Sequence, residues 1–512
     1  MDKKMTNSRT INSLRNAVVG VTGQFFVFIL QFVCRTVFVS TLPTDYLGVN
    51  GLFFNIINIL SLSELGFGAA FLYSMYGPMV EQDYKKITQI LNLYRRIYLI
   101  IAAVIFLVGL LFTPLLGKIV GNHERIPNLE IIYLLFLLNS VASYIWIYKK
   151  SLIEASQQNY ICSIYQKGTT VLLNISQIIF LLVTHNYIIY LVLQIASNII
   201  SNWLISLKAE KMFPQVDKKD KSLPNQMERS KIFNNTKALA FHRIGWVLNN
   251  NTDNFIMSIF TSMFTVGIYS NYTLLITNLS IFINVILSSF SASVGNMGIT
   301  ESSEKSREVF HTLHFISFWI YSLCGICLMN LLNPFITIWI GHNYLLPMGL
   351  VIIIVINFYI YGMRIISFIY VDAYGIAYDT KYKSIVEAFI NILASIILVR
   401  QFGLIGIFIG TTIAYISVFW REVVSIYKKI FKCMPSEYFK NYAKYALFFA
   451  IANIITYRIG LLIPDGDIFL LIMKAILIVV MYHILLYAMF AKFRRLLSIG
   501  RGKIKLILLG QT

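Results

Sequence analysis

Long apolar stretches, each about the length of a membrane-spanning helix, follow one another through almost the whole chain. A helix crosses about 30 Å of hydrocarbon with roughly 20 residues. By this measure the sequence predicts fourteen spans, at residues 15–40, 47–76, 91–116, 129–149, 161–184, 186–207, 236–260, 266–294, 310–332, 347–371, 382–400, 404–427, 441–463 and 467–491. No stretch between them could hold a soluble domain, so the pattern predicts an all-α integral membrane protein.

Composition agrees with lipid as the solvent. The 512 residues are 57% hydrophobic and 13% charged, which leaves too little polar surface for a soluble domain. The ten prolines are expected at or near the breaks between spans, where a missing N–H does least harm. The basic N-terminus leads into a span too long for a cleavable signal peptide, so we expect this first span to be permanent.

The net charge of +20 comes from basic residues in alternate loops between spans. Cytoplasmic loops of membrane proteins are enriched in Lys and Arg, and this rule explains the charge better than nucleic-acid binding does. It predicts an even number of spans and places both termini in the cytoplasm. We therefore expect membrane lipid, and no nucleic acid, as a partner.

The longest polar interruption, Lys208 to Lys231, divides the spans into two groups. We expect an N-lobe of spans one to six (1–207), a cytoplasmic linker (208–235), a C-lobe of spans seven to twelve (236–430), and spans 13 and 14 with a basic cytoplasmic tail (431–512). A weak internal repeat supports two lobes, because an offset of 219 residues lays 35–50 on 254–269 and pairs Gly48 with Gly267. Six spans per lobe predict a parallel repeat, related by an axis along the membrane normal.

Ionisable and amide side chains inside the spans are candidates for function, because charge in hydrocarbon normally faces a cavity or a partner. The guanidinium of arginine binds phosphate well, so the cations and the amides near them could line a substrate cavity. The carboxylates could neutralise the positive charge of these cations or bind a coupling ion. The alternative is that these groups only hold the helices together. The substrate-cavity candidates are Gln24, Gln31, Arg35, Arg243, Asn250, Asn357 and Arg364, and the candidates for charge balance or ion coupling are Glu64, Asp253, Asp372 and Glu387.

Nothing in the sequence indicates a catalytic residue, a metal site or a cofactor. His311 and His314 have helical spacing but no carboxylate or cysteine set nearby to complete a metal site. The five cysteines form no plausible disulfide framework, and Cys324 and Cys327 are interpreted as helix-packing residues. A nucleotide-binding P-loop motif is absent, so any driving energy must come from a gradient or a partner.

Several segments together resemble one known family. They are Arg35 to Gly48, LSLSELGFGAAFLYSMYGPM (60–79), NTDNFIMSIF (251–260), VGIYSNY (266–272) and SASVGNM (291–297). Over nearly the whole chain the sequence resembles the polysaccharide biosynthesis proteins, or Wzx-type oligosaccharide flippases, of the multidrug/oligosaccharidyl-lipid/polysaccharide (MOP) exporter superfamily.

The resemblance implies a fold like that of the multidrug and toxin extrusion (MATE) transporters, with two six-helix lobes around a central cavity and two C-terminal helices. It implies a bacterial cytoplasmic-membrane protein, not an enzyme, that flips a polyprenyl-diphosphate-linked oligosaccharide for capsule, O-antigen, exopolysaccharide or teichoic acid. A polysaccharide polymerase and export machinery are possible partners. Three alternatives stay open: an ion-coupled small-molecule exporter, a peptidoglycan-precursor flippase, and a membrane polysaccharide polymerase.

Overall fold

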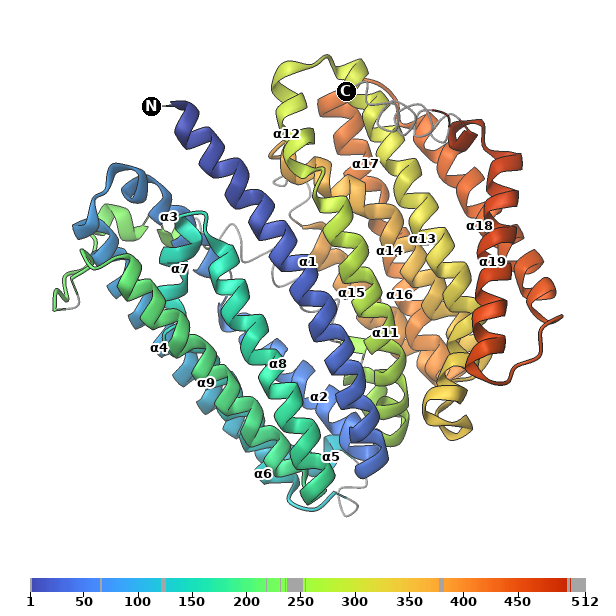
Figure 1. The fold of residues 1–512 in the computed structure, drawn as a ribbon, viewed down its shortest axis with the longest axis horizontal. Coiled ribbons are helices and arrows are strands. Elements are labelled where there is room, and N and C mark those ends of the chain that lie inside the picture. The colour runs from blue at the N-terminus through green and yellow to red at the C-terminus, as the bar shows by residue number, and fades with distance from the viewer. Residues whose placement is uncertain are drawn as a thin grey trace. The chain divides into compact units, whose positions relative to one another are not determined.

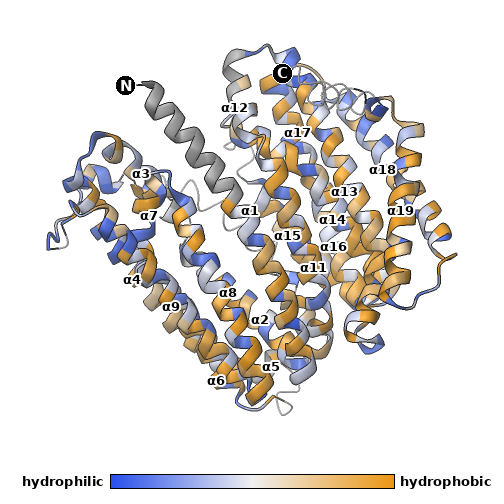
Figure 2. Cartoon of the chain, in the orientation of Figure 1, coloured by the Kyte–Doolittle hydropathy of each residue, from blue (hydrophilic) through white to orange (hydrophobic). Residues whose placement is uncertain are grey.

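The computed structural model describes residues 2–494 and 498, apart from 65–66, 121–125, 218, 231, 235, 237–251, 254 and 377–381. Every regular element among these residues is a helix, and none of them forms a strand (Figure 1). Hydrophobic residues, coloured orange in Figure 2, run along most of the helices, as expected of helices whose solvent is lipid. The predicted all-α membrane fold is confirmed.

The chain divides into two compact units. The first comprises Met1–Val285 and Tyr378–Val418, and the second comprises Ile286–Ala377 and Phe419–Thr512. These bounds differ from the expected lobes, because the first unit takes in helices that we assigned to the C-lobe. The division into lobes 1–207 and 236–430 with a linker at 208–235 therefore stays a prediction.

The first unit is built on neighbouring long helices. Helix α8 packs against both α1 and α9, α6 packs against α4 and α9, and α15 pairs with α16. The helices of this unit are α1 (Asp2–Thr41), α2 (Asp45–Leu60), α3 (Phe67–Glu81), α4 (Tyr84–Phe112), α5 (Leu116–Val120), α6 (Leu129–Tyr144), α7 (Ile147–Ala155), α8 (Asn159–Thr184), α9 (Tyr187–Met212), α11 (Met263–Ser288, to Val285), α15 (Lys383–Phe402) and α16 (Leu404–Val418), with 3₁₀ turns η1 (Ser61–Glu64) and η2 (Thr113–Leu115).

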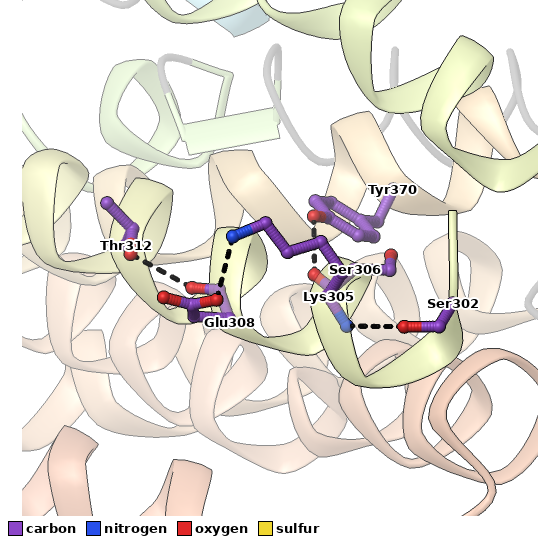
Figure 3. A network of polar contacts seen from close by, with 6 residues as sticks. All are labelled: Ser302, Lys305, Ser306, Glu308, Thr312 and Tyr370. Carbon is purple, nitrogen blue, oxygen red and sulfur yellow. Dashed lines mark hydrogen bonds and ion pairs between the residues drawn. The ribbon is translucent and has the colours of Figure 1, made fainter. Parts of the chain in front are cut away.

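The second unit is arranged around its longest helix, α13, which contacts α14, α18 and α19. Ser302 caps α13, since its Oγ accepts a hydrogen bond from the Lys305 backbone N–H at 3.2 Å, and Tyr370 donates to the Ser306 carbonyl at 3.0 Å (Figure 3). The elements are α12 (Ser291–Thr300), α13 (Ser303–Ile340), η4 (His342–Tyr344), α14 (Met348–Ala373), α17 (Trp420–Ile426), the π-helical turn η6 (Tyr427–Phe431), α18 (Ser436–Gly460) and α19 (Ile468–Met489).

Ten of the described helices are long and apolar enough to cross a membrane, or eleven if α6 and α7, bent by 41°, form one span. The seventh predicted span lies mostly outside the described residues. The thirteenth corresponds to α18, a helix of 25 residues that carries Lys444, Asn453 and Arg458 and is not among the ten. The number fourteen therefore stays a prediction, whereas a multi-pass membrane protein is established.

The second predicted span is wrong as a continuous helix over 47–76. Helix α2 ends at Leu60, and the 3₁₀ turn η1 separates it from α3. Polar contacts lie at the break: the Ser61 hydroxyl donates to the Ile57 carbonyl at 2.8 Å, and the Tyr98 hydroxyl donates to the Glu64 carboxylate at 2.7 Å.

The expectation that all prolines lie at or near breaks is also wrong. Pro78 lies inside α3 and Pro334 inside α13. Both occupy the last two turns of their helices, and neighbouring helices in a membrane can satisfy the backbone groups that a proline frees.

Close packing of α13 on α14 gives a prediction for stability. A Cβ added at Gly362 would lie 2.0 Å from Cγ of the Tyr321 ring, whereas one added at Gly168 would meet nothing within 4 Å. We expect Gly362→Ala to destabilise the purified protein by about 1–3 kcal/mol, the usual effect of overpacking, and Gly168→Ala to change it little. Thermal unfolding in detergent measures both, and equal midpoints would contradict this packing.

Candidate functional site

A cavity of about 200 Å³ lies in the first unit, where α1, α8 and α9 meet the beginning of α2 and the middle of α11. Among the described side chains that line it are one cation, five amides and no carboxylate. The lining residues are Gln31, Cys34, Arg35, Phe38, Leu47, Asn50, Thr170, Leu173, Asn174, Gln177, Tyr190, Gln194 and Leu274. The cavity therefore combines a site for an anion with groups that can hydrogen-bond hydroxyls.

Arg35 supplies the positive charge of this cavity from the last two turns of α1. Its Nη1 donates a hydrogen bond of 3.0 Å to the Ser270 hydroxyl on α11. A guanidinium carries five N–H donors, so this one bond leaves most of its donor capacity for other acceptors at the cavity. Its planar fork also matches the geometry of a phosphate.

The amides around Arg35 are held by contacts among α1, α2, α8 and α9. Gln177 donates from Nε2 to the Tyr190 carbonyl at 3.1 Å. The Tyr187 hydroxyl donates to Asn50 Oδ1 at 3.2 Å. Stable amide dipoles of this kind can exchange hydrogen bonds with sugar hydroxyls or phosphate oxygens.

Of the predicted cavity residues, the structure brings Gln31 and Arg35 together. Gln24 lies two turns earlier on α1, where its Oε1 accepts a hydrogen bond from the Lys167 ammonium of α8. Lys167 is thus a second cation on the same helix pair, and its stem packs beside Gly23, whose added Cβ would lie 3.1 Å from Lys167 Cγ.

Asp253 belongs to a separate polar group of the first unit, formed with α15 and α16. Thr411 donates from Oγ1 to Asp253 Oδ2 at 3.1 Å, and Asn391 donates from Nδ2 to the same Thr411 oxygen at 3.1 Å. Ser395 extends the group by donating to Asn391 Oδ1 at 3.4 Å. All three of these partners are buried.

The other two carboxylates that the sequence predicted as candidates in this unit face partners of their own. Glu387 lies 3.5 Å from the Lys383 ammonium one turn away, and both side chains are buried. Glu64 accepts the hydrogen bond of Tyr98 at the edge of an aromatic cluster in which Phe71 stacks on Tyr94. Neither residue lines the cavity around Arg35.

Arg364, Asn357 and Asp372 all lie on α14 of the second unit. Arg364 is 3% exposed, its Nε lies 4.0 Å from Glu422 Oε2, and the Phe368 ring lies 5.2 Å from its guanidinium carbon. Asn357 is buried, whereas Asp372 is exposed near the end of the helix. This setting indicates a buried ion pair around Arg364.

Arg243 and Asn250 lie outside the described residues, so their placement stays a prediction. Within the described part of the chain, no group of three or more His, Cys, Asp or Glu side chains could hold a metal ion.

Sequence reasoning missed several polar residues that the structure places at these sites. Asn174, Gln177 and Gln194 line the cavity from spans five and six, and amides inside apolar spans were a signal available in the sequence. Ser270 and Glu422 could not be found that way, because only the fold brings them to Arg35 and Arg364.

Solved structures of membrane transporters share this fold. The lipid II flippase MurJ, in an inward closed conformation, is 16% identical in sequence and has a TM-score of 0.63. The match covers 91% of this chain and 97% of the MurJ chain. The MATE transporter VcmN of Vibrio cholerae matches with 15% identity, 84% and 99% coverage and a TM-score of 0.60. A MOP superfamily transporter from Pyrococcus furiosus, described as having a binding pocket of reverse polarity, matches with 14% identity, 82% and 96% coverage and a TM-score of 0.50.

The fold is therefore the one seen in multi-pass transporters of the MOP superfamily. Residues 13–291 match the family model described as polysaccharide biosynthesis protein, and the chain belongs to that family. No curated protein matches the sequence.

Proposed function

We propose that this protein flips a polyprenyl-diphosphate-linked oligosaccharide from the cytoplasmic to the outer face of a bacterial cytoplasmic membrane, with both termini in the cytoplasm. The product would feed the synthesis of a surface polysaccharide such as capsule, O-antigen, exopolysaccharide or teichoic acid. A polysaccharide polymerase and export machinery are the partners that this role implies.

The chemistry of the Arg35 cavity is the observation that carries the proposal. A diphosphate needs cationic donors, and sugars need groups that both donate and accept hydrogen bonds. The cavity offers Arg35 and five amides, with no carboxylate among its lining residues. Family membership supports a substrate from polysaccharide synthesis.

Transport requires no covalent chemistry in this account. The head group binds at Arg35 while the polyprenyl chain stays in lipid, and the protein alternates between states that open the cavity to one side and then to the other. The carboxylates Asp253 and Glu387, both outside this cavity, are candidates for binding a coupling ion.

Two alternatives differ in the polarity of the cavity or in its substrate. An exporter of hydrophobic cations would be served by carboxylates, and the described cavity lining has none. A peptidoglycan-precursor flippase would also use a cation for a lipid diphosphate, and the fold of the lipid II flippase is shared. The experiment must therefore identify the substrate as well as detect its transport. A polymerase, the third alternative, would act on repeats already at the outer face.

Complementation of a native host that lacks this gene tests the proposal. We expect loss of the gene to leave the lipid-linked repeat on the cytoplasmic side and to abolish surface polymer, and restored expression to reverse both. Normal surface polymer with a defect in peptidoglycan precursors would favour the alternative flippase. A repeat that accumulates on the outer face would indicate a polymerase.

A further inference from the structure

Two glycines that occupy equivalent positions in the internal repeat lie in contact. Gly48 is in the first turn of α2 and Gly267 is in the second turn of α11, separated by the repeat offset of 219 residues. A Cβ added at Gly267 would lie 2.5 Å from the Thr44 carbonyl oxygen and 3.2 Å from the Gly48 nitrogen. Only glycine allows the two helices to approach this closely at their N-terminal ends.

The contact is reciprocal under the repeat. A Cβ added at Gly48 would lie 2.0 Å from the backbone oxygen of Met263, and Met263 is the repeat equivalent of Thr44. Each glycine thus meets the residue four positions before the other, as in an interface between related halves. The crossing of α2 and α11 therefore has the reciprocity expected of a contact between the two predicted repeats.

A hydrogen-bonded chain joins this crossing to the Arg35 cavity. Arg35 Nη1 donates to Ser270 Oγ at 3.0 Å, and Ser270 Oγ donates to the Gly267 carbonyl at 2.7 Å. The guanidinium that serves the cavity is thus bonded to the helical turn that carries one of the two crossing glycines.

We propose that the α2/α11 crossing is a gate of the transport cavity, that the Arg35–Ser270 bond latches it closed, and that a diphosphate at Arg35 releases the latch. The anion competes with the Ser270 hydroxyl for the guanidinium, since an ionic acceptor forms the stronger hydrogen bond. Substrate binding would thereby lower the stability of the closed crossing, as a ligand must if it is to shift the population of states. This inference rests on the proposed function, and it assigns Ser270 as a positioning residue.

A cysteine pair across the crossing tests the latch. A Cβ added at Gly51 would lie 3.9 Å from Val266 Cγ1, an ordinary contact, so Gly51→Cys and Val266→Cys place two thiols within reach without moving the helices. The natural cysteines are first replaced with alanine: Cys34, Cys162, Cys324, Cys327 and Cys433. The rate of disulfide formation in the full chain, reconstituted in lipid nanodiscs, then reports how often the crossing is closed.

Two perturbations should slow the cross-link. Inorganic diphosphate should slow it about tenfold against a chloride control of equal ionic strength, the size expected for losing one hydrogen bond to a charged group. Ser270→Ala should slow it to a similar degree and abolish the effect of diphosphate. Ser280→Ala is the matched control, because its hydroxyl bonds its own α11 backbone, the Ile276 carbonyl, at 2.9 Å, and it should leave the rate unchanged.

The outcomes separate this inference from the proposed function. Equal rates of disulfide formation in Ser270→Ala and Ser280→Ala would overturn the latch alone. So would a rate in the parent cysteine pair that diphosphate leaves unchanged, if Arg35 is needed for flipping in the host. Normal flipping by Arg35→Ala would overturn the proposed site, and the anion release with it. A Gly267→Val variant checks the reporter, because added bulk at the crossing must suppress the cross-link.

Discussion

Replacing Arg35 with alanine is expected to lower flipping at least about tenfold and to leave the lipid-linked repeat on the cytoplasmic face. The reason is the loss of the only cation among the residues that line the described cavity. Hydrogen bonds to charged groups contribute roughly 1.5–3 kcal/mol, and about 1.4 kcal/mol is one factor of ten. Complementation of a flippase-deleted host, with the repeat assayed on each side of the membrane, measures the change.

Two further variants make the Arg35 result specific. Arg35→Lys keeps the charge but loses the bidentate fork, so we expect it to restore flipping only in part. Arg400→Ala removes an exposed arginine at the end of α15 and should behave as the wild type. Full activity in well-expressed Arg35→Ala would contradict the role assigned to this cavity.

Removing Glu422 is expected to have the largest effect on stability. Glu422 and Arg364 are each 3% exposed and lie 4.0 Å apart, so Glu422→Ala removes a negative charge that faces a buried guanidinium. Breaking a buried ion pair in this way typically destabilises a protein by about 3–5 kcal/mol. Thermal unfolding of the purified protein should show a loss of several degrees.

The exposed pair of Lys305 and Glu308 in the same unit provides the control (Figure 3). Glu308 is 63% exposed, so Glu308→Ala should change the stability by less than about 1 kcal/mol. Arg364→Ala should likewise lower the unfolding temperature, whereas Arg35→Ala should not. An Arg364→Ala protein of normal stability that no longer flips would instead support the substrate role that the sequence predicts for Arg364.

The sequence predicted the helical membrane fold well because apolar length is a direct requirement of the bilayer. It failed at the second span, where α2 ends at Leu60 and the polar segment Ser61–Glu64 forms the 3₁₀ turn η1. A window of mean hydropathy hides such a break, since the flanking residues are apolar on both sides.

Polarity inside a span singled out residues that have polar surroundings, but not how they group; their roles stay predictions. Arg35 and Gln31 do line one cavity, and Asp253 does meet polar partners. Whether a charged residue inside a span lines a cavity or forms an ion pair depends on the residue that faces it. Arg364 faces Glu422, which lies on a separate segment of the chain. The paired glycines show the same limit, because the repeat aligned Gly48 with Gly267 but only the fold reveals that they touch.

Transport by the purified protein alone tests the central claim most directly. The protein is reconstituted into liposomes that carry a polyprenyl-diphosphate oligosaccharide on both leaflets, and a membrane-impermeant glycosidase is added outside. We predict that wild-type protein lets the enzyme reach nearly all of the oligosaccharide, whereas Arg35→Ala protein leaves the inner-leaflet share protected, as in protein-free liposomes. Protection of that share by correctly folded wild-type protein would contradict the account.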